Sequence, residues 1–206
     1  EASPEFIHFL SSLSLHCFTN EYIYIEKDKE TKLVKNLETE ITQTISRSEQ
    51  PEAKKILCLA SYRPLNQYNW FQKLKALDNL EEVKSRLIEE PSTERETMKA
   101  IPILSEISDS VSSKVREQYE ENPYPRWVKI GLPLKARLIS EICSAKNLHL
   151  NSKSIQNEVA PNILVAGCGT GQHSIETAST FSNCQVTAVD LSLASLAYAK
   201  RMTTKL

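Results

Sequence analysis

The sequence predicts an α/β protein in which an all-helical N-terminal region precedes the first two strands of a doubly wound, parallel sheet. Over the first 110 residues, apolar side chains recur at spacings of three and four, which is the period of a helix. Two short apolar runs, Ile163–Ala166 and Val186–Val189, are expected to be strands buried on both faces. Three of the chain's four glycines follow the first run, at Gly167, Gly169 and Gly171. This order of strand, glycine loop, helix and strand is typical of a doubly wound sheet.

The remaining elements follow from the same periodicity and from prolines that interrupt it. The expected helices before the first strand cover residues 6–17, 31–45, 51–63, 70–89, 93–99, 111–121 and 134–145, with Pro91 separating two of them. After the glycine loop, helices are expected to about residue 181 and over residues 191–202. We therefore divide the chain into a helical domain (1–110), a segment with a helix, a proline-rich turn and a connection (111–160), and a sheet domain (161–206).

Composition and charge exclude several classes of protein. With 40% hydrophobic and 25% charged residues, the chain is expected to be globular. A net charge of −1 gives no indication of nucleic-acid binding, and no apolar run is long enough to cross a membrane. Five separated cysteines without a C-x-x-C pair predict a reduced, cytoplasmic chain. His8, His16 and His149 do not have metal-ligand spacing, so no metal site is expected.

The glycine loop and one carboxylate predict a cofactor that contains a nucleoside. Glycines after a buried strand let a ligand lie against bare backbone at the N-terminus of a helix. Asp190 follows the second strand, 23 residues after Gly167, where a carboxylate can accept two hydrogen bonds from a ribose diol. Cys168, between two glycines, is interpreted as a small residue that fills space rather than as a nucleophile.

The residues after the loop narrow the choice of cofactor. A phosphate-binding P-loop requires Gly-Lys-Ser/Thr, but Gly171 is followed by Gln172 and His173. The dinucleotide fingerprint requires glycine or alanine where the chain has Gln172, which disfavours a nicotinamide-dependent oxidoreductase. The observed pattern is instead G-x-G-x-G.

This pattern resembles a known family. The segments ILVAGCGTG and VTAVDLS resemble motif I and the following acidic loop of class I S-adenosylmethionine-dependent methyltransferases. CFTNEYIY and QYEENPYPRW resemble a bacterial branch of these enzymes that is often fused to tetratricopeptide repeats. The resemblance implies a Rossmann-like sheet and S-adenosylmethionine as cofactor. One residue departs from the pattern, because Val165 stands where the family commonly has Asp or Glu.

The resemblance also assigns roles to individual residues. Gly167, Cys168, Gly169, Thr170 and Gly171 would form the loop that lines the methionine and ribose of the cofactor. Asp190 would hold the ribose hydroxyls, and Leu191 and Ser192 would flank the adenosine. No residue is indicated as catalytic.

The proline-rich turn upstream of the sheet has two interpretations. Its side chains Tyr119, Tyr124, Arg126 and Trp127 could form a lid over the cofactor or meet the substrate. Alternatively, Tyr124 and Trp127 fill the space between the helical and α/β parts. The sequence favours neither.

The expected function is therefore methyl transfer from S-adenosylmethionine to an unidentified acceptor. Two strands with two flanking helices do not cover a sheet, so we expect this chain to be the N-terminal portion of a longer enzyme and to be inactive alone. The alternative is a non-enzymatic scaffold whose helical domain binds a protein partner and whose nucleotide-binding fold is vestigial.

Overall fold

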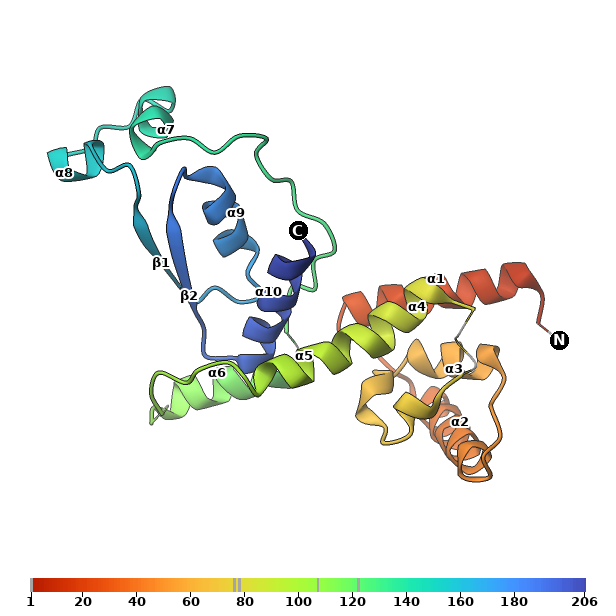
Figure 1. The fold of residues 1–206 in the computed structure, drawn as a ribbon. Helices are drawn as coiled ribbons and strands as arrows, with labels where there is room; N and C mark the ends of the chain where they lie inside the picture. The colour runs from red at the N-terminus through yellow and green to blue at the C-terminus, as the bar shows by residue number, and fades with distance from the viewer. Residues whose placement is uncertain (1, 76, 78, 107, 122) are drawn as a thin grey trace. The chain divides into compact units, whose positions relative to one another are not determined.

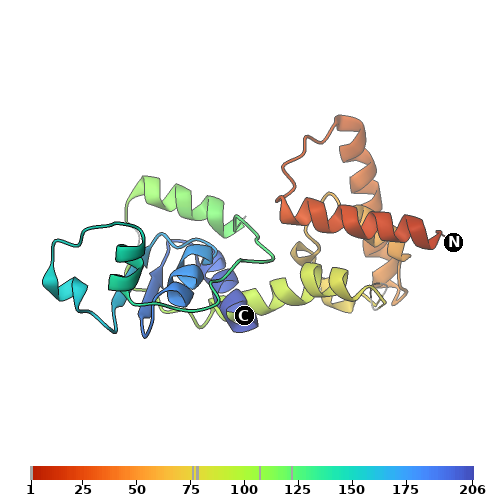
Figure 2. The same cartoon turned by 90° about the horizontal axis from the view of Figure 1, so that it is seen from above.

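The structure, a computed structural model, describes residues 2–75, 77, 79–106, 108–121 and 123–206. These residues form two compact units that divide between Glu96 and Thr97, and Figures 1 and 2 show their helices and strands. Compactness alone does not define a folding domain, so the expected domains 1–110, 111–160 and 161–206 stay predictions.

The N-terminal unit is helical. Its elements are α1 (Pro4–Thr19), α2 (Asp28–Ser46), α3 (Ala53–Ala60), two 3₁₀ turns (Leu65–Gln67 and Phe71–Lys73), α4 (Glu81–Lys84), a π-helical turn (Ser85–Glu89) and α5, which continues to Met98 (Glu90–Met98). Their apolar stripes meet in one core whose largest fully buried side chains are Ile41, Ile56, Leu57, Leu59, Leu65, Leu77 and Leu87. The first three expected helices are confirmed to within a few residues at each end.

The expected helices over residues 70–89 and 93–99 are wrong in two respects. Residues 71–73 form a 3₁₀ turn, and the helix begins only at Glu81. Trp70 instead anchors the core, where its indole N–H donates to Thr42 Oγ1 (3.0 Å). Helical structure then continues past Pro91 rather than breaking there. The π-helical turn Ser85–Glu89 ends two residues before Pro91, which is the second residue of α5.

The C-terminal unit contains a parallel sheet of two strands within the described residues. β1 (Asn162–Ala166) pairs with β2 (Gln185–Val189) in a register that matches Asn162 with Gln185 and Ala166 with Val189. The other elements are α6 (Ser110–Glu121), α7 (Ile139–Ala145), α8 (Lys153–Gln156), α9 (Gln172–Thr180) and α10 (Leu193–Lys205). The predicted order of strand, loop, helix, strand and helix is confirmed (Figure 1).

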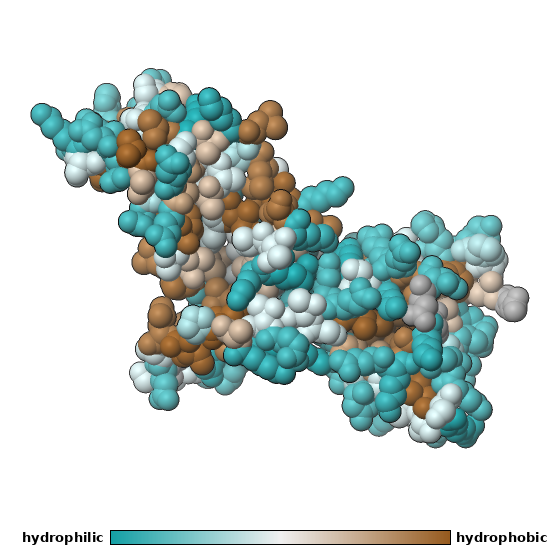
Figure 3. Space-filling model, in the orientation of Figure 1, coloured by the Kyte–Doolittle hydropathy of each residue, from teal (hydrophilic) through white to brown (hydrophobic). Residues whose placement is uncertain are grey.

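The expectation that both strands are buried on both faces is wrong for the described residues. Val165 is buried, whereas its neighbour Leu164 is 66% exposed. Because successive side chains of a strand point to opposite faces, one face of the sheet packs inside the unit and the other is open. Figure 3 shows apolar side chains on the surface of this unit near the sheet.

The expected helix over residues 134–145 is wrong in its first part. Helix α7 begins at Ile139, and Arg137 instead makes a parallel bridge with Phe181. The Arg137 N–H donates to the Thr180 carbonyl (3.0 Å), and the Arg137 carbonyl accepts from the Ser182 N–H (2.9 Å). These bonds hold residue 137 in an extended conformation that a helix cannot adopt.

None of the helices in the described parts of the chain is both long enough and apolar enough to cross a membrane.

Candidate cofactor-binding site

The loop Gly167–Gly171 joins β1 to α9 at the carboxyl end of the sheet. Its start is bonded to the end of β2, because the N–H groups of Gly167 and Cys168 both donate to the Val189 carbonyl (2.8 and 3.1 Å). Its end is closed by a hydrogen bond from the Gly171 N–H to the Cys168 carbonyl (3.0 Å). Backbone hydrogen bonds thus fix the loop at both ends. The middle of the loop lies at the carboxyl end of the sheet, where ligands of open α/β sheets bind.

The glycines of this loop serve two different purposes. A Cβ added to Gly167 or Gly169 would meet no atom within 4 Å, so the backbone there borders open space. A Cβ on Gly171 would lie 2.5 Å from the Cβ of Ala199, which is closer than real Cβ atoms approach. Gly171 also caps α9 with a left-handed backbone (φ +84°). The close packing of the loop on α10 therefore explains Gly171. Gly167 (φ +69°) and Gly169 (φ +52°) also have the left-handed backbone that favours glycine, and they leave the loop accessible.

Asp190 links the glycine loop to the turn that follows β2. Its Oδ2 accepts a hydrogen bond from the Gly169 N–H (2.7 Å), and its Oδ1 accepts one from the Ser192 N–H (2.9 Å). An ionised carboxylate has about four lone-pair sites, so both oxygens keep acceptor capacity for a ribose diol. The arrangement fits the expected cofactor, since the carboxylate stands beside the open backbone of Gly169.

The turn after Asp190 begins helix α10. Ser192 is fully buried, and its Oγ accepts from the Ser195 N–H (3.0 Å) as the helix cap. Leu191 is 42% exposed and is free to contact a ligand. Of the two residues predicted to flank the adenosine, Leu191 is accessible and Ser192 supports the turn from inside.

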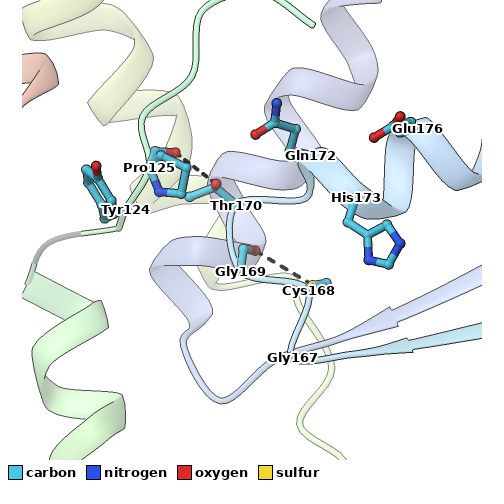
Figure 4. Close-up of a pocket in the computed structure, with 9 residues that line it drawn as sticks. All are labelled: Tyr124, Pro125, Gly167, Cys168, Gly169, Thr170, Gln172, His173 and Glu176. Atoms are coloured by element: carbon cyan, nitrogen blue, oxygen red, sulfur yellow. Dashed lines mark hydrogen bonds between the residues drawn. The ribbon is translucent and has the colours of Figure 1, made fainter. Parts of the chain in front are cut away.

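A cavity of about 430 Å³ opens beside the loop (Figure 4). Its lining residues are Tyr124, Pro125, Gly167, Cys168, Gly169, Thr170, Gln172, His173 and Glu176. The structure thus brings Tyr124 of the proline-rich turn to the glycine loop. Thr170 Oγ1 donates to the Pro125 carbonyl (2.8 Å), and this bond links the glycine loop to the proline-rich turn. The α9 side chains His173 and Glu176 were not predicted as site residues, and their spacing on one face of a helix was the only available signal.

Of the other residues predicted for this turn, Arg126 and Trp127 are packed inside the unit, whereas Tyr119 of α6 is 40% exposed. Trp127 is 8% exposed, and its ring meets Tyr198 edge to face. Arg126 is buried with its guanidinium 5.8 Å from the centroid of the Tyr198 ring. Tyr119 contributes its carbonyl, which accepts from Ser192 Oγ (3.0 Å). In this geometry Tyr124 borders the cavity, whereas Trp127 fills space between the loop and α10.

Cys168 behaves as a spacer. It is 7% exposed, and burial, reinforced by the charge of Asp190, raises the pKa of its thiol. A thiol with a raised pKa stays protonated at neutral pH and is a poor nucleophile. In the described parts of the chain, no group of three or more His, Cys, Asp and Glu side chains could hold a metal ion.

Comparison with known proteins gives a match for the C-terminal segment. Residues 163–206 match the family model of a methyltransferase domain. The match begins in β1 and contains the whole glycine loop, Asp190 and α10. Members of this domain family generally use S-adenosylmethionine. No curated protein and no solved structure matches the chain. The match supports a methyltransferase activity and an enzyme.

Proposed function

We propose that the protein is an S-adenosylmethionine-dependent methyltransferase that binds its cofactor at the Gly167–Gly171 loop and Asp190. The observation that carries this proposal is the methyltransferase-domain match over residues 163–206, which contains both features. On this proposal, β1 and β2 begin a Rossmann-like, doubly wound sheet. The scaffold alternative is not favoured by this match, and no observation favours a nicotinamide cofactor.

Each part of the site would have a separate task. The bare backbone of Gly167 and Gly169 would allow close approach of the cofactor, and the Asp190 carboxylate would hold the ribose hydroxyls. The exposed Leu191 would pack against the adenine. S-adenosylmethionine supplies a methyl group on a sulfonium, which is already an excellent leaving group.

The task left to the protein is to orient the acceptor and exclude water. Tyr124, on the far wall of the cavity from α9, is placed to do both in this proposal (Figure 4). The cavity residues His173 and Glu176 are compatible with several polar acceptors.

Photochemical crosslinking of tritiated S-adenosylmethionine to the intact protein tests this proposal. We expect label in the peptide that contains Gly167–Gly171, because the open backbone there is the predicted contact. An excess of S-adenosylhomocysteine should suppress the label and NADH should not. Suppression by NADH alone, or label confined to residues 2–96, would contradict the proposal.

A further inference from the structure

We infer that two described parts of the chain, Tyr119–Glu121 and Pro125–Trp127, form a clamp that positions the two cofactor-binding loops, with Glu120 and Trp127 as its two ends. This inference rests on the proposed function for the identity of the ligand. Trp127 is 8% exposed, and both carboxylate oxygens of Glu120 accept from N–H groups at the start of α10. Both would therefore act through the residues they hold and not by touching the cofactor.

At the first end of the clamp, Glu120 binds the backbone at the start of α10, just after Asp190. The backbone N–H groups of Leu193 and Ala194 donate to the two carboxylate oxygens of Glu120 (2.6 and 3.2 Å). The first N–H groups of a helix have no partner within the helix, and a negative charge is favourable there. Glu120 belongs to α6, so a distant helix completes the cap that Ser192 begins on α10.

A second bond strengthens this end. The buried Ser192 hydroxyl donates to the Tyr119 carbonyl (3.0 Å) while it accepts from the Ser195 N–H. The last turn of α6 is thus bonded to the same three-residue turn that carries the Asp190 carboxylate and the exposed Leu191.

At the other end of the clamp, Trp127 and Pro125 form hydrogen bonds with the glycine loop. The indole N–H of Trp127 donates to the Thr170 carbonyl (3.0 Å), and Thr170 Oγ1 donates to the Pro125 carbonyl. Thr170 is 2% exposed and stands between Gly169 and Gly171. Tyr198 of α10 in turn donates its hydroxyl to the Trp127 carbonyl. Thr170 is thereby held by the Trp127 side chain and the Pro125 backbone, which belong to one short segment.

These contacts form a continuous path of hydrogen bonds and peptide bonds between the two ends of the clamp. From Glu120 it runs through the N-terminus of α10 to Ser192 and Asp190, across the 2.7 Å bond to Gly169, and through Thr170 to Trp127. Glu120 and Trp127 are seven residues apart in the sequence. The position of the Asp190 carboxylate beside the Gly169 backbone is therefore supported from both sides. A site fixed in advance loses less conformational entropy on binding.

Glu120→Ala in the intact protein tests the clamp with two readouts. Without ligand, we expect amide hydrogen exchange at Leu193, Ala194 and Gly169 to become about tenfold faster, because the cap and the loop lose a charge-assisted anchor. In calorimetry, the Kd for S-adenosylhomocysteine should rise about tenfold for the same reason.

Three further variants make the test specific. Glu120→Gln keeps one carbonyl oxygen as an acceptor and should restore part of both effects. Glu117→Ala removes an exposed carboxylate from the same helix and should match the unchanged protein. Trp127→Phe keeps an aromatic side chain but removes the indole N–H together with the five-membered ring, so it should speed exchange at Gly171. Circular dichroism of this variant shows whether the unit stays folded.

The outcomes separate the clamp from the proposed function. If Glu120→Ala lowers the melting temperature but leaves Gly169 exchange and the Kd unchanged, Glu120 only caps α10 and the clamp is refuted. If the unchanged protein does not bind S-adenosylhomocysteine, the proposed function fails, and the exchange rates of the ligand-free variants still decide whether the clamp holds the loops.

Discussion

Replacing Gly171 with alanine is expected to destabilise the C-terminal unit by about 3–5 kcal/mol, which is a large part of the stability of an ordinary domain. The new Cβ would lie 2.5 Å from the Cβ of Ala199 and 3.0 Å from its Cα, so α10 would have to move as a body. The left-handed backbone at residue 171 (φ +84°) adds strain for any residue with a side chain. Urea unfolding followed by amide exchange in β1 and β2 measures the effect.

Gly131→Ala is the matched control for this prediction. A Cβ at Gly131 would meet no atom within 4 Å, and its backbone is not left-handed. This variant should therefore unfold at the same urea concentration as the unchanged protein. Equal midpoints for Gly171→Ala and Gly131→Ala would show that α10 does not pack on the loop as described.

Replacing Gly169 with valine is expected to weaken cofactor binding at least about a hundredfold while the unit stays folded, a loss of about 2.7 kcal/mol or more. A Cβ at this position has open space around it, so the branched side chain would stand where we place the ligand and not in the protein core. Strain from the left-handed backbone (φ +52°) should cost about 1–2 kcal/mol of stability.

Calorimetric titration with S-adenosylhomocysteine checks this prediction, with circular dichroism to show that the variant is folded. Gly131→Val provides the control for the addition of a branched side chain to the same unit. Normal affinity of the folded Gly169→Val protein would place the cofactor away from this loop.

The parts of the fold that the sequence predicts are those set by local pattern. An apolar run followed by clustered glycines suffices to define β1, the loop and the start of α9, because these features need few distant partners. The helical stripes of the N-terminal unit were predictable for the same reason. Pro91 was misleading, because a proline is normally a helix stop, whereas here it is the second residue of α5 and follows a π-helical turn.

The parts that the sequence does not predict depend on contacts between distant segments. Arg137 is held extended by Thr180 and Ser182, and nothing near residue 137 in the sequence announces these partners. From the sequence, Glu120 is one of several charged residues expected on the solvent-exposed face of a helix. In the structure its carboxylate caps α10. A glycine pattern likewise cannot distinguish Gly169, which borders open space, from Gly171, which packs against a neighbouring helix.

The most direct test of the account is a calorimetric titration of S-adenosylhomocysteine into the intact protein and its Asp190→Ala variant. We predict saturable binding to the unchanged protein and a loss of about 1.5–3 kcal/mol in the variant, because a charge-assisted pair of hydrogen bonds to the ribose disappears. Amide exchange at Gly169 in the same variant shows how far the loop has also loosened, since Asp190 accepts the Gly169 N–H. Absence of binding to the unchanged protein, or unchanged affinity in Asp190→Ala, would contradict the assignment of this site to S-adenosylmethionine.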